Sequence, residues 1–71
     1  MVKNNFIRLH NSDDNSVIII NIDHIVMVDS DTSKEKLTGR VYMDNNTGID
    51  EFNVNETPEK IYGMIEEMTN K

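Results

Sequence analysis

The sequence contains no cysteine, so neither a disulfide nor a thiolate metal site can stabilise the fold. Its 71 residues form one domain, 1–71, and a domain of this size buries only about 60% of the surface that its unfolded chain exposes. Small scaffolds without disulfides depend on a structural metal or on self-association. A zinc site would need both His10 and His24, which lie far apart in sequence, together with carboxylates that the fold brings close. The composition therefore favours self-association.

Basic residues are scarce as well. Seven of them stand against thirteen acids, which gives a net charge of −6. The nearest approach to a basic run is Lys34, Lys36 and Arg40, and Glu35 lies among them. Because phosphate contacts dominate nucleic-acid affinity, this balance disfavours nucleic acid, and it also disfavours an anionic membrane surface. A DNA-binding regulator is the weaker alternative.

Long apolar runs are missing too. The longest nearly apolar stretch, Val17–Val28, is interrupted by Asn21, Asp23 and His24 and is too short to span a membrane. The first residues lead into no apolar signal-peptide core. We therefore expect a cytoplasmic protein, and the abundance of Asn and Ile is typical of an AT-rich bacterial or phage genome.

Alternating and β-branched residues predict three strands in the first half of the chain. Residues 6–10 place Ile7 and Leu9 on one face. The polar residues 11–16 favour a turn. Apolar strands are predicted over 17–20 and 25–28, with a tight corner between them and the polar connection "DSDTSKE" after the second.

Two further strands follow. Residues 36–43 alternate, which places Leu37, Val41 and Met43 on one face with Gly39 among them. The sequence "NNTG" predicts a hairpin turn. The fifth strand contains Phe52 and Val54, and Ile49 is out of phase with them, which predicts a bulge or an early strand end.

A helix is predicted over about 58–70. Thr57 is a good N-cap, Pro58 occupies the favoured first helical position, and Glu59 is stabilised by the helix dipole. Apolar residues at helical spacing form one narrow stripe, and a helix this short is stable only when its stripe packs on the sheet. The stripe consists of Ile61, Met64, Ile65 and Met68.

These elements predict an α+β fold, an antiparallel five-stranded β-meander with one C-terminal helix. Strands two and three are apolar at nearly every position, although a sheet covered on one face should alternate. Either the sheet curls into a small open barrel, or a second copy of the chain covers its other face. The aromatic residues opposite the predicted core mark an interface or pack under a loop. The candidate interface residues are Phe6, Ile19, Val26, Val28 and Tyr42.

The patterns that resemble catalytic or metal-binding motifs are incomplete. Asp23 and His24 are adjacent, so on an extended chain they point to opposite faces, and no third catalytic residue is marked. The segment that starts at Asp29 begins like a calcium loop, with Asp29, Asp31 and Ser33 at alternate positions, but it has Lys34 where Gly is needed and Arg40 where Glu is needed. We therefore expect no catalytic residue, no metal ligand and no cofactor. The exposed acids of the helix, Glu59, Glu66 and Glu67, form a face that suits a basic protein partner.

Four short patterns occur in order along the chain. They are a strand with I-x-L, an Asn before an I-x-x-I corner, a Gly hairpin, and V-x-E-[ST]-x-E-x-[IV] leading into the last helix. The matching positions are Ile7-Arg8-Leu9, Asn21 with Ile22 and Ile25, Gly48, and the segment Val54–Ile61. In these patterns the chain resembles the small flagellar-operon proteins of the FlbD and SwrD type. It departs from them in a longer first loop without Asn-Gly and in one extra residue between Gly48 and Val54.

The sequence thus predicts a small, non-enzymatic interaction module that self-associates through a sheet face or edge. The resemblance implies the alternative of an accessory protein in motility. A metal-binding protein that uses Asp23, His24 and His10 is less favoured.

Overall fold

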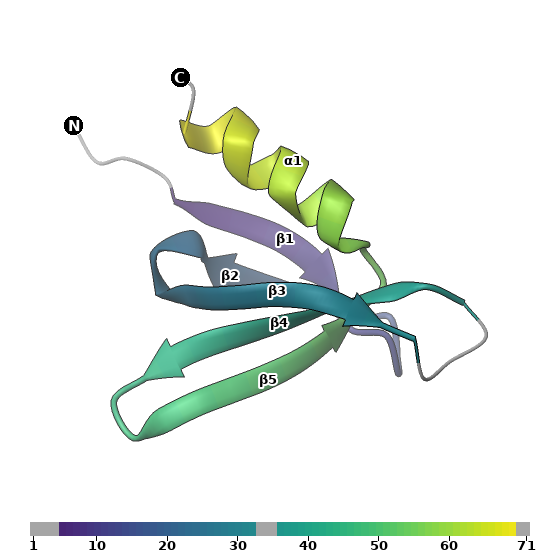
Figure 1. Ribbon diagram of the computed structural model, residues 1–71, viewed down its shortest axis with the longest axis horizontal. Coiled ribbons are helices and arrows are strands. Elements are labelled where there is room, and N and C mark those ends of the chain that lie inside the picture. Colours follow the sequence, from purple (N-terminus) through teal and green to yellow (C-terminus); the bar gives the residue numbers. More distant parts are fainter. Residues whose placement is uncertain (1–4, 33–35, 70–71) are drawn as a thin grey trace.

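The computed structural model describes residues 5–32 and 36–69 of the chain. Within these ranges the strands and helices follow in the order shown in Figure 1. They are β1 (Phe6–His10), β2 (Val17–Asn21), the 3-10 helix η1 (Ile22–His24), β3 (Ile25–Asp31), β4 (Thr38–Asn45), β5 (Gly48–Val54) and α1 (Pro58–Thr69).

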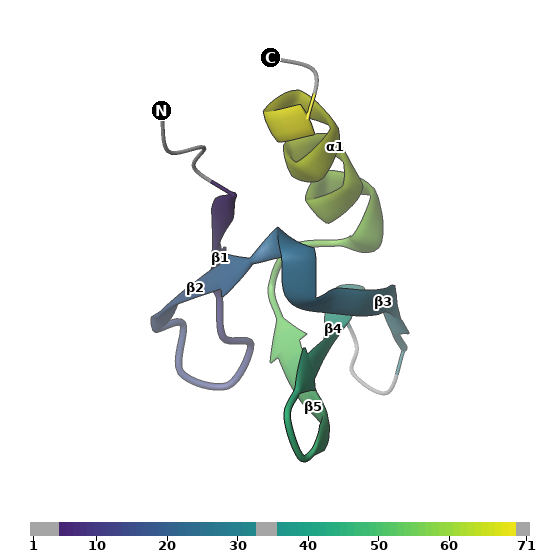
Figure 2. The ribbon, with the colours of Figure 1, turned by 90° about the vertical axis from the view of Figure 1, so that its left-hand side faces the viewer.

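The strands form two antiparallel sheets, a β1–β2 hairpin and a β3–β4–β5 meander. This arrangement confirms the predicted α+β fold, and the strands are not closed into a barrel. The two sheets meet where the ends of β1 and β5 converge (Figure 1). There Asn11 bridges Val54, the Ser12 amide donates to the Asn53 carbonyl at 3.0 Å, and the Asn55 amide donates to the His10 carbonyl at 2.8 Å. Away from this junction the sheets diverge (Figure 2).

The hairpin shows the predicted alternation. Ile7 pairs with Ile20, and both are buried. Leu9, two residues further along β1, is fully buried, whereas Phe6 and Ile19 on the opposite face are exposed. The predicted placement of Ile7 and Leu9 on the core face is confirmed.

The predictions for the second sheet need three corrections. Strand β3 continues to Asp31 because its last residues pair with β4, so the first part of the predicted polar connection is strand. Residues 33–35 of that connection lie outside the described residues. Leu37 precedes β4 and is exposed, whereas Val41 is fully buried as predicted. Ile49 pairs regularly with Asp44, and the register shift lies in β3, between residues 25 and 27.

The helix begins as predicted. The Thr57 hydroxyl accepts a hydrogen bond from the Lys60 amide at 3.3 Å, which is the expected N-cap contact. Ile61 is fully buried, and Met64, Ile65 and Met68 pack against the core. The predicted last residue, 70, lies outside the described range. Neither helix of the described chain is long and apolar enough to cross a membrane.

Gly39 determines how closely β4 approaches the start of α1. A Cβ at this position would overlap the carbonyl oxygen of Glu56 and would lie 3.2 Å from Cδ1 of Ile61. The core centres where β1, β2, β4, β5 and α1 meet. Its buried apolar members are Ile7, Leu9, Ile20, Val41, Val54 and Ile61.

Candidate functional site

The junction of the two sheets is fixed by a buried carboxylate. Glu56 is only 8% exposed. Its Oε1 accepts the His10 amide at 3.0 Å, and its Oε2 lies 2.7 Å from Nδ1 of the His10 ring. Burial raises the pKa of Glu56, but the hydrogen bonds from His10 outweigh this effect and hold its pKa below the ordinary value. Both Glu56 oxygens are engaged, so this pair connects β1 to the helix start.

The corner between β2 and β3 is also structural. Asn21 caps η1 by accepting the Asp23 amide at 3.0 Å, and the Asn5 side chain donates to Asp23 at 2.8 Å. His24 is exposed. Within residues 5–32 and 36–69, no group of three or more His, Asp or Glu side chains is placed to hold a metal ion. This geometry agrees with the tight corner that the sequence predicts between the strands 17–20 and 25–28.

The outer face of the second sheet holds a polar network. Arg40 donates to both carboxylate oxygens of Asp29, at 3.0 and 3.2 Å, and the Tyr42 hydroxyl donates to the same carboxylate at 3.4 Å. These bonds lower the pKa of Asp29 and raise that of Arg40, whereas burial raises the pKa of Tyr42. The guanidinium also lies 5.7 Å from the Tyr42 ring centroid. Tyr42 therefore has partners within its own chain.

The five candidate interface residues lie on different surfaces. Phe6 and Ile19 share the outer face of the hairpin, and both are exposed. Val26 is exposed at the register shift of β3. Val28 is half-buried and pairs with Val41 on the core side, next to α1. Tyr42 belongs to the polar network, so the structure brings only Phe6 and Ile19 together.

Strand β2 has an open backbone edge. The Asn11 amide donates to the Ser16 carbonyl and the Ile22 amide to the Asn5 carbonyl, one bond at each end of the hairpin. Because bonded and non-bonded pairs alternate in an antiparallel ladder, the backbone groups of Val17 and Ile19 point away from β1. No strand of the described chain pairs with β2 on that side.

The other open edges are protected by charge or by irregular backbone. The β3 edge has a register shift and contains Asp29 and Asp31, and β5 contains Asp50 and Glu51. The free side of β1 contains Arg8, and at its end the His10 backbone is bonded to Glu56 and Asn55. Charges and bulges on an edge strand oppose pairing with other chains. Strand β2 reads Val-Ile-Ile-Ile-Asn and contains neither feature. It is therefore the open edge best suited to pair with another strand.

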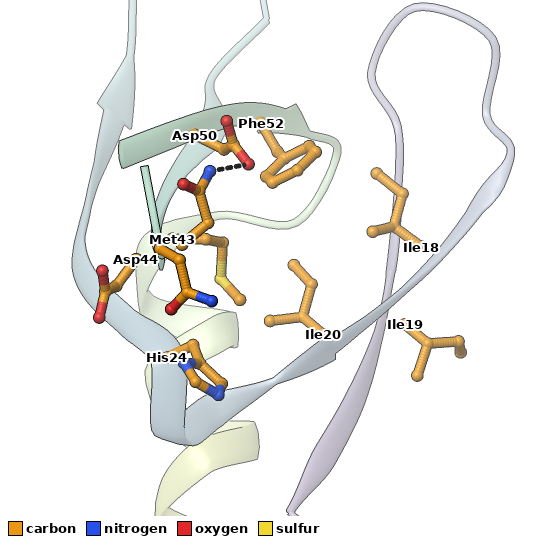
Figure 3. Close-up of a pocket in the computed structure, with 10 residues that line it drawn as sticks. Ile18, Ile19, Ile20, His24, Met43, Asp44, Asp50 and Phe52 are labelled. Carbon is orange, nitrogen blue, oxygen red and sulfur yellow. Dashed lines mark hydrogen bonds between the residues drawn. The ribbon is translucent and has the colours of Figure 1, made fainter. Parts of the chain in front are cut away.

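A cleft of about 420 Å³ lies between β2 and the hairpin of β4 and β5. Figure 3 shows Ile18 and Ile20 pointing across it toward Met43 and Phe52, while Ile19 points away. The four side chains that face one another form an apolar floor. Around them lies a polar rim of His24, Asp44, Asn45, Asn46 and Asp50.

The rim is acidic and partly preorganised. Asn45 donates to Oδ2 of Asp50 at 2.6 Å (Figure 3). Asp44 is exposed, and its carboxylate points away from the cleft (Figure 3), because the register pairs it with Ile49 on the face opposite Met43. Sequence reasoning missed this cleft because Met43 and Phe52 were expected to be ordinary core residues. The relevant signal was Asp50, an acid that shares a sheet face with Met43 and Phe52.

Comparisons of the chain with family models, with curated proteins and with solved structures find no match. The resemblance to small flagellar-operon proteins therefore stays a prediction. The β2 edge and the cleft are two features of the described chain that its own contacts leave open.

Proposed function

We propose that the chain is a cytoplasmic, non-enzymatic interaction module that self-associates by pairing β2 with β2 of a second copy. The observation that supports this proposal is the open and uncharged edge of β2. An antiparallel pairing centred on Ile19 extends the hairpin into a four-stranded sheet about a two-fold axis. In that sheet the outward backbone groups of each β2 pair with those of the other copy.

Charge supports a second copy at this edge. A two-fold interface places each charged group near its own counterpart, so a chain with a net charge of −6 associates best through a neutral patch. Strand β2 carries no charge, its own Val17 is exposed, and Phe6 on the outer face of β1 is exposed as well. Arg8 also lies on that face, opposite Ile19, but on β1 and therefore one strand away from the proposed seam. The acids that flank β2 in sequence, Asp14 and Asp23, are hydrogen-bonded to Ser16 and Asn5.

The available area indicates a weak dimer. A standard interface buries about 800 Å² on each partner, which is about one sixth of the 5100 Å² surface of this chain. The edge and outer face of one five-residue strand supply less than that. We therefore expect reversible dimerisation with a dissociation constant on the order of micromolar.

Sedimentation velocity between about 5 and 500 μM tests the proposal, because this range spans the expected constant. The decisive variant is Ile19→Lys, which places a charge on the edge and should leave only monomer. Ile49→Lys is the matched control, since Ile49 is 56% exposed and Ile19 is 57% exposed, and Ile49 lies on β5. Wild-type protein that stays monomeric throughout, or equal effects of the two variants, would contradict the proposal.

Proline variants separate the backbone edge from the side chain. The Ile19 amide makes no bond to β1, so Ile19→Pro should leave the hairpin folded and abolish the dimer. Ile18→Pro removes an amide that bonds to Leu9 and should instead destabilise the hairpin itself. A folded Ile19→Pro protein, monitored by circular dichroism, that still dimerises would exclude pairing through this edge.

A further inference from the structure

The cleft between β2 and the β4–β5 hairpin has an apolar floor that the chain itself covers incompletely. Ile18, Met43 and Phe52 are only half-buried there. The cleft volume of about 420 Å³ is within the range of about 300 to 1,000 Å³ that is usual for ligand sites. An occupant with aliphatic groups would remove the remaining apolar surface from water.

The cleft is continuous with the open edge of β2. It is lined by residues of β2, η1 and the β4–β5 hairpin, and no described residue of β1 is among them. The inward side chains of β1, Ile7 and Leu9, are instead buried in the core. A strand that pairs with the free edge of β2 therefore runs along the cleft, on the side away from β1.

Pairing at this edge determines which side chains of an added strand face the cleft. The outward backbone groups of β2 belong to Val17 and Ile19, whose side chains lie on the outer face of the hairpin. Residues that bond to these groups lie on the same outer face, and the residues between them lie opposite Ile18 and Ile20. Because Ile18 and Ile20 point into the cleft (Figure 3), every second side chain of the added strand points there too.

Other kinds of occupant fit this place less well. A small apolar molecule or a helix would cover the floor but would leave the outward backbone groups of β2 without a protein partner. An anionic amphiphile would bring a second negative charge close to Asp50, which lines the cleft and is already hydrogen-bonded to Asn45. An extended strand satisfies the edge and the floor together.

We infer that the cleft and the β2 edge together form a docking site for an extended segment of another protein that has aliphatic residues at alternate positions. The segment adds a third strand to the β1–β2 hairpin, and its aliphatic side chains lie between Ile18 and Phe52. It competes with a second copy of the chain for the same edge. The inference goes beyond self-association and does not require it.

The probe is a fluorescein-labelled synthetic peptide, Thr-Ile-Thr-Ile-Thr-Ile-Thr, with blocked ends and with N-methyl groups on its Ile amides. When the Ile side chains enter the cleft, these amides point away from β2, so their methylation leaves the pairing with β2 intact and hinders assembly of the peptide into sheets. The matched control carries the N-methyl groups on its Thr amides, which point toward β2. Fluorescence anisotropy, at protein concentrations below those of self-association, should show binding of the first peptide only.

Two matched variants locate the site. Ile18→Ala should weaken binding about fivefold, because it removes apolar contact area from the cleft. Ile49→Ala should leave the affinity unchanged, since Ile49 is exposed on β5 and does not line the cleft. In the wild-type protein, the methyl NMR signals of Ile20 and Met43 should shift on titration, because these side chains lie on the floor.

Several outcomes would overturn the inference. They are no binding of the first peptide, equal binding of the two N-methylated peptides, equal effects of the two alanine variants, or methyl shifts confined to residues outside the cleft. Saturating peptide should also dissociate any dimer in sedimentation velocity, and a dimer that persists with peptide bound would contradict a shared edge. A chain that stays monomeric at all concentrations but binds the first peptide would contradict the proposed self-association alone.

Discussion

The sheets face each other both at the junction and across the cleft. At the junction polar or small residues are buried, whereas in the cleft apolar residues remain partly exposed. The junction holds Glu56, Gly39 and Thr38, all buried although none is strongly apolar. The cleft holds Ile18 and Phe52, which are only half-buried. The difference follows from α1, because Ile61 packs beside Gly39 at the junction, whereas no described residue of α1 lines the cleft. In this small fold, the position of α1 determines which residues between the sheets are buried.

The largest expected effect comes from filling the junction. Gly39→Ala should destabilise the chain by about 3 kcal/mol, because the new Cβ would overlap the Glu56 carbonyl oxygen, which belongs to the backbone and has little freedom to move. Urea denaturation followed by circular dichroism measures the loss of unfolding free energy.

Gly63→Ala is the control for this variant. A Cβ at Gly63 meets nothing within 4 Å, and Gly63 lies inside α1, so the substitution should stabilise the chain by up to about 1 kcal/mol. If both glycine variants changed the free energy of unfolding in the same direction, the contrast between a tight junction and an open surface would not hold.

A smaller effect is expected at the buried carboxylate of the junction. Glu56→Gln should cost about 1 to 2 kcal/mol at neutral pH, because the neutral amide accepts weaker hydrogen bonds from His10 than the carboxylate does. The pKa of Glu56 is held below its ordinary value of 4.5, so its contribution is fully present above pH 4.5 and is lost as the pH falls through the lowered pKa.

The measurement is urea denaturation of wild type and Glu56→Gln between about pH 7 and about pH 2.5, where the difference should narrow on the acid side. Glu67→Gln changes an exposed helical acid and should follow the wild type throughout. A constant difference between wild type and Glu56→Gln at all pH values would show that the ionised carboxylate is not responsible.

The smallest expected effect is a gain of stability at the edge of the junction. The Thr38 hydroxyl is buried and has no hydrogen-bond partner within the described residues. Thr38→Val keeps the shape of the side chain and removes the unpaired hydroxyl, so it should stabilise the chain by about 1 kcal/mol, or raise the melting temperature by about 4 to 8 °C. Thr57→Val removes the helix N-cap and should lower the melting temperature. A lower melting temperature for Thr38→Val would indicate that its hydroxyl is satisfied.

Local patterns in the sequence predicted most of the secondary structure. The alternation of Ile7 and Leu9 and the capped helix after Thr57 are confirmed because neighbouring residues determine them. The first part of "DSDTSKE" was wrongly assigned to a connection because its polar residues are typical of loops. In the structure Asp29 continues β3 because Arg40 lies opposite it on β4.

The division into two sheets and the cleft between them could not be predicted. They depend on the pairing of His10 with Glu56, which are 46 residues apart, and neither residue is marked by its neighbours. The apolar excess of β2 was recognised from Ile18, Ile19 and Ile20. Only the register distinguishes their roles, because it places Ile19 on the outer face and the other two toward the cleft.

The long sequence separation at the junction also has a kinetic consequence. Both hairpins close over short turns, but the contact between His10 and Glu56 closes a loop of most of the chain. Loop-closure entropy makes such contacts slow to form, so the hairpins should form first and the joining of the sheets should be a late event in folding. Before that event the uncharged β2 strand is separate from the core that later covers Ile20, and this is when the chain is most exposed to misassembly.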